Sequence, residues 1–583
     1  MDLDRRNVLR ALTAAALTGV APKLARAADD GSIYDVKRFG GVRVLHMTDA
    51  HAQLLPVHFR EPSVNIGVAA MRGQPPHLVG EAFLRQFGFA PGTRQAHAFT
   101  YLDYEKSARR FGKLGGFAHI KTLVERLRAE AGPGRSLLLD GGDLMQGSGL
   151  SNAMQGADMV EAANLLGVDA MTAHWEFTYG EDAVRANIAK LKSEFLAQNV
   201  FLTDEAQFND APAFDSASGL VFKPATIKEV GGHRLAVVGQ AFPYTPVAHP
   251  KRFTPDWTFG IHADKLQKLV DKLRADDKVD AVLLLSHNGM DVDLKLAAQV
   301  SGIDVVLGGH THDAVPRPSV VANRGGKTLV TNAGCGGNFL AVLDLDLDKG
   351  RVKDARYELL PVHADLLPPD RDMQALIERL RKPHEAAFAE KLAVADRLLY
   401  RRGNFNGTMD QLICDILRQE LDAEIALSPG FRWGNTVLPG QPITMEDVLS
   451  ETAITYPQVY VQDMTGAQLK AVMEDICDNL FNPDPYYQQG GDMVRIGGMD
   501  YACAPEEAVG RRISDMVLDS GKAIEADKTY RVAGWASVNE QSGKPVWDIL
   551  ANHLRAAKTV SLKRVNRVAL KGVAGNPGLA AEA

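Results

Sequence analysis

The sequence of 583 residues is poor in cysteine, in clustered positive charge and in long apolar runs. No stretch of Lys and Arg marks a nucleic-acid footprint, and a formal net charge of −7 disfavours polymeric substrates that bind through their phosphates. Beyond the N-terminus no segment has about 18 consecutive apolar residues, so no membrane span is expected. The four cysteines show no CxxC spacing, which leaves both disulfide pairing and buried free thiols open.

The first 27 residues have the order of a secretory signal peptide. Arg5 and Arg6 belong to a charged segment, residues 11–21 form a short apolar run, and residues 25–27 read Ala-Arg-Ala, a small-x-small cleavage site. The adjacent arginines resemble a twin-arginine signal, which exports proteins that are already folded. We therefore expect cleavage after residue 27 and a soluble protein in the periplasm.

The length of the chain and its alternation of short apolar runs with amphipathic stretches predict two domains. A layered α/β domain is expected over 36–365, with a Pro/Gly/His-containing insertion at about 56–110 that lies near the mouth of the site or forms a plain surface loop. A helical linker (366–392) leads to a C-terminal α+β domain (393–572) and a loose tail (573–583). The predicted strands of the first domain are 42–47, 136–139, 169–172, 234–239, 281–286, 304–307, 328–332 and 339–347.

Carboxylates and imidazoles follow five of these strands at their carboxyl ends. In open α/β sheets sites form outside the carboxyl ends of the strands, so these side chains are expected to converge. Seven nitrogen and oxygen donors are too many for one ion and include no thiolate, which fits two divalent cations bridged by one carboxylate. Imidazole with carboxylate suits Mn, Fe, Zn or Co and does not select among them. The candidate metal ligands are Asp49, His51, Asp143, His174, His287, His310 and His312.

The order of these motifs, across about residues 40–345, is similar to that of the metallophosphoesterase domain of the 5′-nucleotidase family. The motifs are Asp-x-His at 49–51, Gly-Asp at 142–143, the loop 173–176, His287 and Gly-His-Thr-His at 309–312. Residues after 393 resemble the C-terminal substrate domain of that family. The resemblance implies a first metal held by Asp49, His51 and His312, a second held by His174, His287 and His310, and a bridging Asp143.

The loop 173–178 departs from the Gly-Asn-His-Glu-Phe-Asp of the family, above all at two positions. His174 replaces an asparagine and remains a neutral ligand. Trp175 replaces the histidine that helps the alkoxide to leave, and an indole cannot give up a proton at neutral pH. Since such acid help contributes typically about 10²–10⁴-fold, the protein is either inactive or acts on a leaving group that needs no proton.

The C-terminal domain also departs from the family, at positions where nucleotidases bind their substrate. Residues 428–432 match an Asn-x-Gly-x-Arg substrate segment except for the leading asparagine. Arg432 keeps a guanidinium that can clamp an oxyanion or form a surface ion pair. Residues 490–498 contain no phenylalanine where nucleotidases stack an aromatic ring on the base. A nucleoside cradle is therefore not evident.

One branch of the superfamily shares these departures. The His-Trp-Glu-Phe loop, the insertion after residues 49–51, the twin-arginine-like start and Phe-Arg-Trp-Gly-Asn at 431–435 resemble the thiosulfohydrolases of periplasmic Sox sulfur-oxidation systems. The resemblance implies an enzyme with two Mn²⁺ ions, Zn²⁺ being the alternative, that hydrolyses a cysteine-S-thiosulfonate on a SoxYZ-like carrier protein. Hydroxide formed at the ions would attack the sulfonate sulfur and release sulfate, and a persulfide anion leaves without a proton.

The resemblance and the departures together assign candidate roles. Trp175 and Arg432 are the candidate catalytic residues, and the candidate substrate contacts are Trp175, Arg432, Trp433, Asn435 and Arg495. Two other hypotheses stay open: a 5′-nucleotidase-like phosphoesterase with altered substrate, and a metal-bearing binding module without activity. Retention of all seven metal ligands argues against the inactive module. No nucleic-acid or membrane partner is expected.

Overall fold

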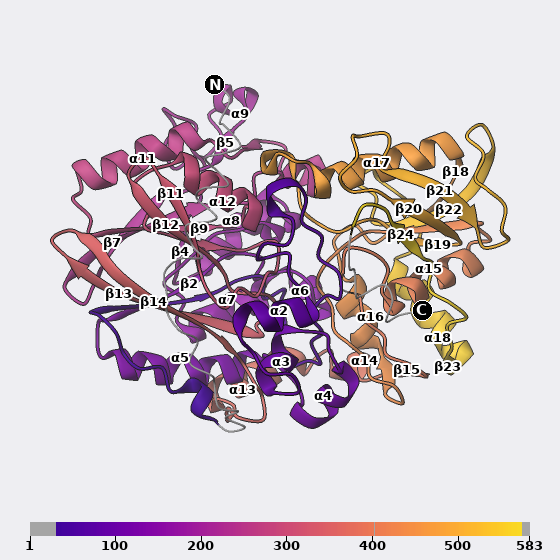
Figure 1. The fold of residues 1–583 in the computed structure, drawn as a ribbon, viewed down its shortest axis with the longest axis horizontal. Helices are drawn as coiled ribbons and strands as arrows, with labels where there is room; N and C mark the ends of the chain where they lie inside the picture. The colour runs from indigo at the N-terminus through magenta and orange to yellow at the C-terminus, as the bar shows by residue number, and fades with distance from the viewer. Residues whose placement is uncertain (1–30, 402, 574–583) are drawn as a thin grey trace. The chain divides into compact units, whose positions relative to one another are not determined.

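The computed structural model describes residues 31–401 and 403–573 (Figure 1). The predicted signal peptide (1–27) and almost all of the predicted tail (573–583) lie outside the described residues. The described chain forms two compact units. Unit 1 contains the residues up to Pro56, Lys113–Gln146 and Ala153–Leu380, and unit 2 contains Val57–Gly112, Gly147–Asn152 and the residues from Arg381 onward.

Unit 1 is built around two six-stranded sheets. In order across the sheet, the first consists of β14 (Arg351–Pro361), β13 (Phe339–Asp348), β1 (Val42–Met47), β2 (Ser136–Asp140), β3 (Ala170–Met171) and β4 (Glu194–Phe195). The second consists of β11 (Ser319–Asn323), β12 (Gly326–Asn332), β10 (Val305–Gly308), β9 (Ala281–Ser286), β7 (His233–Gln240) and β6 (Ala225–Val230). The run β1 to β4 is parallel, and so is the run β12, β10, β9 and β7.

Apolar side chains fill the space between the two sheets. Val44 of β1, Leu283 of β9 and Leu307 of β10 are fully buried in one cluster that draws on both sheets. On the outer faces α5 (Phe117–Ala131) contacts β1, and α12 (Met290–Gln299) contacts β10, β11 and β12. Strands covered on both faces bury every residue. This explains the nearly continuous apolar run of β9, and β1 is also buried along its whole length although it contains Arg43 and His46. The predicted layered α/β architecture is confirmed.

Shorter elements complete unit 1 and lead out of it. They are α7 (Ala157–Leu166), η4 (Trp175–Tyr179), α8 (Glu181–Lys190), β5 (Val200–Leu202), α9 (Asp204–Phe208), α10 (Thr245–Ala248), β8 (Trp257–Phe259), α11 (Ala263–Ala275) and α13 (Arg371–Arg381). The predicted linker 366–392 contains α13 and the short α14 (Glu385–Phe388). No helix within residues 31–401 and 403–573 combines the length and the apolar character that crossing a membrane requires.

Unit 2 mixes three small sheets with helices. The sheets are β17 (Pro442–Thr444), β15 (Lys391–Ala395) and β23 (Thr559–Val560); β18 (Val459–Thr465), β22 (Thr529–Trp535), β16 (Ile425–Ser428) and β19 (Arg495–Gly497); and β21 (Ile513–Leu518), β20 (Met499–Cys503) and β24 (Val568–Leu570). The main helices are α15 (Thr408–Glu420), α16 (Met445–Thr452), α17 (Gly466–Phe481) and α18 (Val546–Ala557). This composition confirms the predicted α+β class of the C-terminal domain.

The segment 57–112 packs as part of unit 2. Val64 and Val68 lie in the same buried cluster as Leu427 of β16. The backbone N–H of Ile66 donates a hydrogen bond to Asn404 Oδ1 over 2.7 Å. The expected insertion of the first domain therefore has its packing partners in unit 2. Its helices are α2 (Gly80–Phe87), α3 (Arg94–Phe99) and α4 (Tyr104–Phe111).

Candidate dimetal site

All seven predicted metal ligands follow the carboxyl ends of parallel strands in unit 1. Because parallel strands end at the same edge of a sheet, residues far apart in the sequence meet there. Asp49 and His51 follow β1, Asp143 follows β2, His174 follows β3, His287 follows β9, and His310 and His312 follow β10.

The ligand atoms of these residues form two groups that share Asp143. Within each group the atoms lie within 4.8 Å of one another. Asp143 Oδ2 lies 3.0 Å from His287 Nε2 and 3.7 Å from His51 Nε2, so one carboxylate contacts both groups. The division coincides with the two ligand sets that the family resemblance implies. One group is Asp49, His51, Asp143 and His312, and the other is Asp143, His174, His287 and His310.

The chemistry of the donors fits divalent cations. All seven side chains are at most 5% exposed. Gathering buried carboxylates and ring-nitrogen lone pairs so closely is costly unless cations or protons lie between them. His51 Nε2 and His312 Nε2, for example, are only 3.0 Å apart. Two carboxylates and five imidazoles without a thiolate suit several first-row divalent metals and select none of them. The cluster can therefore hold two metal ions.

The charges in the cluster shift the pKa values of its members. Burial would raise the pKa of Asp143, but the imidazoles of His287 and His174 hold it well below the usual range of a carboxyl. Burial raises the pKa of Asp49 to about 7, although His287 opposes the shift. Burial would lower the pKa of His287, whereas Asp143 and Asp49 raise it to about 10. A cation must displace the proton of His287, so metal ions and protons compete for this site.

Backbone carbonyls orient two of the imidazoles. His287 Nδ1 lies 2.6 Å from the carbonyl oxygen of Gly141, and His51 Nδ1 lies 3.0 Å from that of Gln146. Since a carbonyl can only accept, each Nδ1 carries the proton when the ring is neutral. The lone pair of Nε2 then faces the cluster, which is the tautomer a metal ligand needs.

Glu176 ties the loop that carries Asp143 to the loop that carries His174. Its buried carboxylate accepts four hydrogen bonds from backbone N–H groups. The donors are Leu144 over 2.7 Å, His174 over 2.8 Å, Met145 over 3.2 Å and Asp143 over 3.3 Å. Four donors on one carboxylate fix the relative position of a shared ligand and its neighbour. The sequence motif contains this glutamate, but nothing in the sequence pattern revealed its role.

Five of the seven candidate ligands have a left-handed backbone. This conformation is uncommon outside glycine and is typical of functional sites, where the surrounding structure compensates its cost. The φ angles are +51° for Asp49, +46° for His51, +56° for Asp143, +72° for His310 and +60° for His312. The glycine before His310 is required by space, because a Cβ on Gly309 would lie 2.3 Å from Thr48 Oγ1. Each sharp turn directly follows a strand and brings the ligand back over the edge of the sheet.

Trp175 lies in the wall of the site, with a side chain 6% exposed. Its ring centroid is 5.3 Å from that of the ligand His174 and 4.4 Å from that of His249. His249 also stacks on His174, at 5.3 Å with an interplanar angle of 3°. Phe242 packs on His174 from a centroid distance of 4.1 Å. His249 and Phe242 were missed by sequence analysis because neither follows one of the ligand-bearing strands.

The other candidate substrate residues belong to unit 2. Arg432 is half-buried and donates a hydrogen bond from Nη1 to the carbonyl oxygen of Gly491 over 3.3 Å. Trp433 is buried and stacks on Phe431 at 4.3 Å. Asn435 donates from its backbone to Glu451 Oε1 over 2.9 Å and from Nδ2 to Asp447 Oδ1 over 2.8 Å. These bonds hold the loop 431–435 in a defined conformation.

Arg495 has a structural place in the core of unit 2. Its side chain is fully buried, and Nη2 donates to Asp492 Oδ2 over 2.8 Å. Nη1 donates to the carbonyl oxygens of Gly403 and Phe405. A guanidinium engaged in this way holds the chain around β19, so its place in the core accounts for Arg495 without a contact to substrate.

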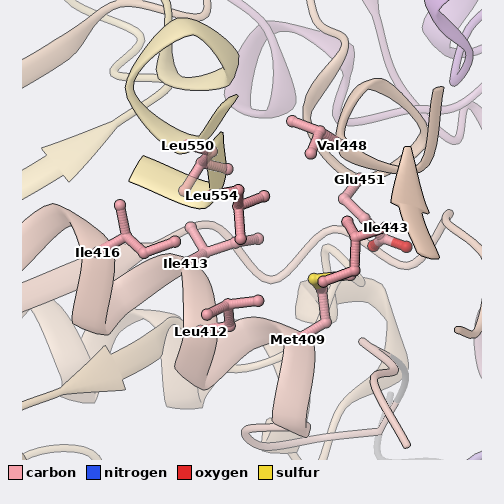
Figure 2. Close-up of a pocket in the computed structure, with 9 residues that line it drawn as sticks. All are labelled: Met409, Leu412, Ile413, Ile416, Ile443, Val448, Glu451, Leu550 and Leu554. Carbon is pink, nitrogen blue, oxygen red and sulfur yellow. The ribbon is translucent and has the colours of Figure 1, made fainter. Parts of the chain in front are cut away.

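Unit 2 contains a small cavity. Figure 2 shows its lining, in which Glu451 is the one charged side chain among eight apolar ones. Substrate sites combine an apolar wall with several convergent polar groups, and this cavity lacks them. We therefore regard it as a packing feature between α15, α16 and α18. Its lining residues are Met409, Leu412, Ile413, Ile416, Ile443, Val448, Glu451, Leu550 and Leu554.

Two family models match the chain. Residues 42–314 match the calcineurin-like phosphoesterase family, and residues 389–548 match the 5′-nucleotidase C-terminal domain. The first match covers all seven candidate ligands, and the second covers the loop 431–435.

Known proteins resemble the chain along most of its length. A solved structure of the sulfate thiohydrolase SoxB from Thermus thermophilus, in complex with glycerol, is 36% identical with a TM-score of 0.87, covering 93% of this chain and 98% of that chain. A 5′-nucleotidase precursor, also from Thermus thermophilus, shares the fold at 22% identity, with a TM-score of 0.70 and coverage of 91% and 99%. The trifunctional nucleotide phosphoesterase YfkN of Bacillus subtilis is 27% identical over 71% of this chain, which spans only 30% of that protein.

Proposed function

Because the chain belongs to the 5′-nucleotidase-type metallophosphoesterases that include SoxB, a family of metal-dependent hydrolases, we propose that it removes sulfate from a cysteine-S-thiosulfonate on a carrier protein. One observation carries the proposal: the ligand cluster is complete, yet Trp175 lies beside it where nucleotidases have an acidic imidazole. An indole cannot protonate an alkoxide. A persulfide anion leaves without a proton, so a sulfur substrate suits this site better than a phosphate ester.

The proposed reaction is a hydrolysis at the sulfonate sulfur. A water oxygen bonds to that sulfur, the bond from it to the neighbouring sulfur breaks, and the electron pair of this bond stays on the persulfide. Sulfate is released, and the protons of the water pass to solvent. Two bound divalent cations, Mn²⁺ in our proposal with Zn²⁺ as the alternative, would polarise the sulfonate oxygens and lower the pKa of the attacking water.

The residues of the chain hold and orient the reactants. Asp143 would bridge the two ions, and Glu176 keeps Asp143 and His174 in register through their backbones. Trp175 would exclude water from the leaving group. Arg432 is proposed to bind sulfonate oxygens through its guanidinium, with Trp433 and Asn435 as further contacts. Asp49, His51 and His312 would hold one ion, and His174, His287 and His310 the other.

The proposed setting is the periplasm, reached in the folded state through the twin-arginine-like signal, with a SoxYZ-like protein as the carrier. The 36% identity to a SoxB over nearly the whole chain supports this setting. The alternative function, a phosphoesterase with altered substrate, is supported by the nucleotidase relatives and would use the same cluster.

The experiment incubates metal-loaded protein with a thiosulfonated SoxYZ-like carrier. Free sulfate is measured by ion chromatography and the carrier by intact-protein mass spectrometry. We expect sulfate and carrier persulfide in equal amounts, and neither product with Asp143→Asn. A carrier that stays thiosulfonated, together with rapid release of phosphate from AMP, would establish the alternative function instead.

A further inference from the structure

His249 is a buried imidazole beside the metal-ligand cluster to which neither the sequence nor the family resemblance assigns a role. It follows α10, and its backbone N–H closes that helix on the carbonyl oxygen of Thr245 over 3.0 Å. Its side chain is 1% exposed. One neighbour is the ligand His174, and the other is Trp175. The substitution that removes the family's histidine from residue 175 is therefore accompanied by a histidine from a different part of the chain.

Both ring nitrogens of His249 are buried, and no residue within 31–401 and 403–573 forms a hydrogen bond with either of them. Native proteins leave few buried polar groups in this state, and those that occur point to a ligand, water or ion. Apolar packing alone would be served better by phenylalanine or leucine, which carry no polar atom. The imidazole therefore calls for a partner that the described chain does not supply.

Direct metal ligation does not account for His249. The two groups whose donor atoms lie within 4.8 Å of one another contain all seven predicted ligands, and neither contains His249. The parallel stack on His174 places the ring alongside a ligand, where it would neighbour whatever the second ion binds. Substrate oxygens are the groups expected at that position of a dimetal hydrolase.

We propose that His249 is a further catalytic residue, which donates a ring N–H to an oxygen of the bound oxyanion. This oxyanion is the sulfonate group of the substrate before the reaction and sulfate after it. The inference rests on the proposed function for the name of the oxyanion. The contact transfers no proton, so it is compatible with a leaving group that needs no acid. Trp175 then has a second role, because its indole packs against the imidazole of His249 at an interplanar angle of 45° and helps to keep it beside the cluster.

Three substitutions distinguish the hydrogen bonding of the ring nitrogens of His249 from the packing of its ring. His249→Phe keeps an aromatic ring against Trp175 and His174 but has no donor. His249→Gln and His249→Asn place an amide N–H near the positions of Nε2 and Nδ1 respectively. His384→Phe, which removes an imidazole that stacks on Phe388 in unit 2, is the matched control.

The first readout is the affinity of the Mn²⁺-loaded protein for inorganic sulfate, measured by titration calorimetry, with metal content per chain measured on the same samples. We expect His249→Phe to weaken sulfate binding about tenfold at unchanged metal content, as expected for the loss of one buried hydrogen bond. One of the two amide variants should restore part of the affinity and thereby identify the donating nitrogen. His384→Phe should bind sulfate like the parent.

The inference is overturned if His249→Phe binds sulfate as tightly as the parent, if the parent binds no sulfate, or if metal is lost together with sulfate. Failure of the proposed function looks different. In that case the parent releases no sulfate from a thiosulfonated carrier, while His249→Phe still weakens the binding of the oxyanion. A parallel measurement of kcat and KM on the carrier distinguishes the two outcomes.

Discussion

The backbone N–H of Trp175 donates a hydrogen bond to Asp143 Oδ1 over 2.6 Å. The residue that replaces the family's histidine thus supports the shared ligand through its main chain, while its indole lies against His174 and His249. A change of side chain at this position leaves the hydrogen bond in place. Metal binding and leaving-group chemistry can therefore be tested separately at residue 175.

Trp175→His should retain both metal ions and should bring no gain in sulfate release from the carrier, because a persulfide needs no acid. Any gain should be in phosphate release from AMP, where an imidazole can protonate the alkoxide. Metal content and steady-state rates on both substrates measure the effect. A large gain on the sulfur substrate would show that the leaving-group argument is wrong.

Asp143 and His174 should respond differently to substitution by asparagine. Asp143 belongs to both ligand groups, so Asp143→Asn should lower metal content and reduce activity by at least about 100-fold. The family itself has asparagine at the position of His174, so His174→Asn should keep two ions per chain. Elemental analysis of the purified variants measures the difference. Equal metal content in the two variants would contradict the bridging role of Asp143.

Glu176→Gln should weaken metal binding without removing a ligand. The carboxylate accepts four backbone N–H groups, and an amide would turn a donor toward some of them. Loss of such support for the ligands typically costs about 10–100-fold in metal affinity or activity. Competition with a metal chelator measures the affinity, and Asp182→Asn on the surface of the same unit is the control. Unchanged metal affinity would mean that Glu176 supports the local fold but not metal binding.

Glu451 in unit 2 should make stability depend on pH. Burial raises the pKa of its carboxyl to about 8, although Arg401 opposes the shift. A carboxyl whose pKa is higher in the folded chain stabilises the fold fully below its unfolded value of 4.5 and loses that contribution as the pH rises toward 8. The free energy of unfolding of the parent should therefore fall across this window.

Glu451→Gln should make the free energy of unfolding depend less on pH. The glutamine keeps an acceptor for the backbone N–H of Asn435 but has no charge to bury. Urea unfolding of the parent and the variant at pH 5 and pH 9 measures the effect. The variant should be the more stable protein at pH 9, and the exposed Glu540→Gln should follow the parent. Parallel curves for Glu451→Gln and the parent would contradict the shifted pKa.

The residues of the candidate metal cluster could be selected from the sequence because their signal is local. Each follows a short buried strand, and β9 has the bounds expected from the sequence, 281–286. His249, by contrast, lies beside the cluster through contacts with residues more than 70 positions away in sequence. The hydrogen bonds of Glu176 likewise depend on the backbone of a distant loop. The packing of Val64 into unit 2 is likewise determined by tertiary contacts, which the periodicity of the sequence does not indicate.

The proposed substrate contacts have a weaker signal in the sequence than the candidate metal ligands. Arginine and tryptophan suit both binding and packing, and only the structure shows that Arg495 is enclosed by Asp492 and backbone carbonyls. The left-handed turns at the ligands also escape sequence reasoning, because aspartate and histidine do not signal a positive φ as glycine does.

The most direct test of the account is the substrate preference of the Mn²⁺-loaded protein, expressed as the ratio of kcat/KM for sulfate release from a thiosulfonated carrier to kcat/KM for phosphate release from AMP. We expect a ratio of at least about 100, since the missing acid slows the reaction of the phosphate ester alone. A ratio below one would contradict it and would identify a phosphoesterase that works without its histidine.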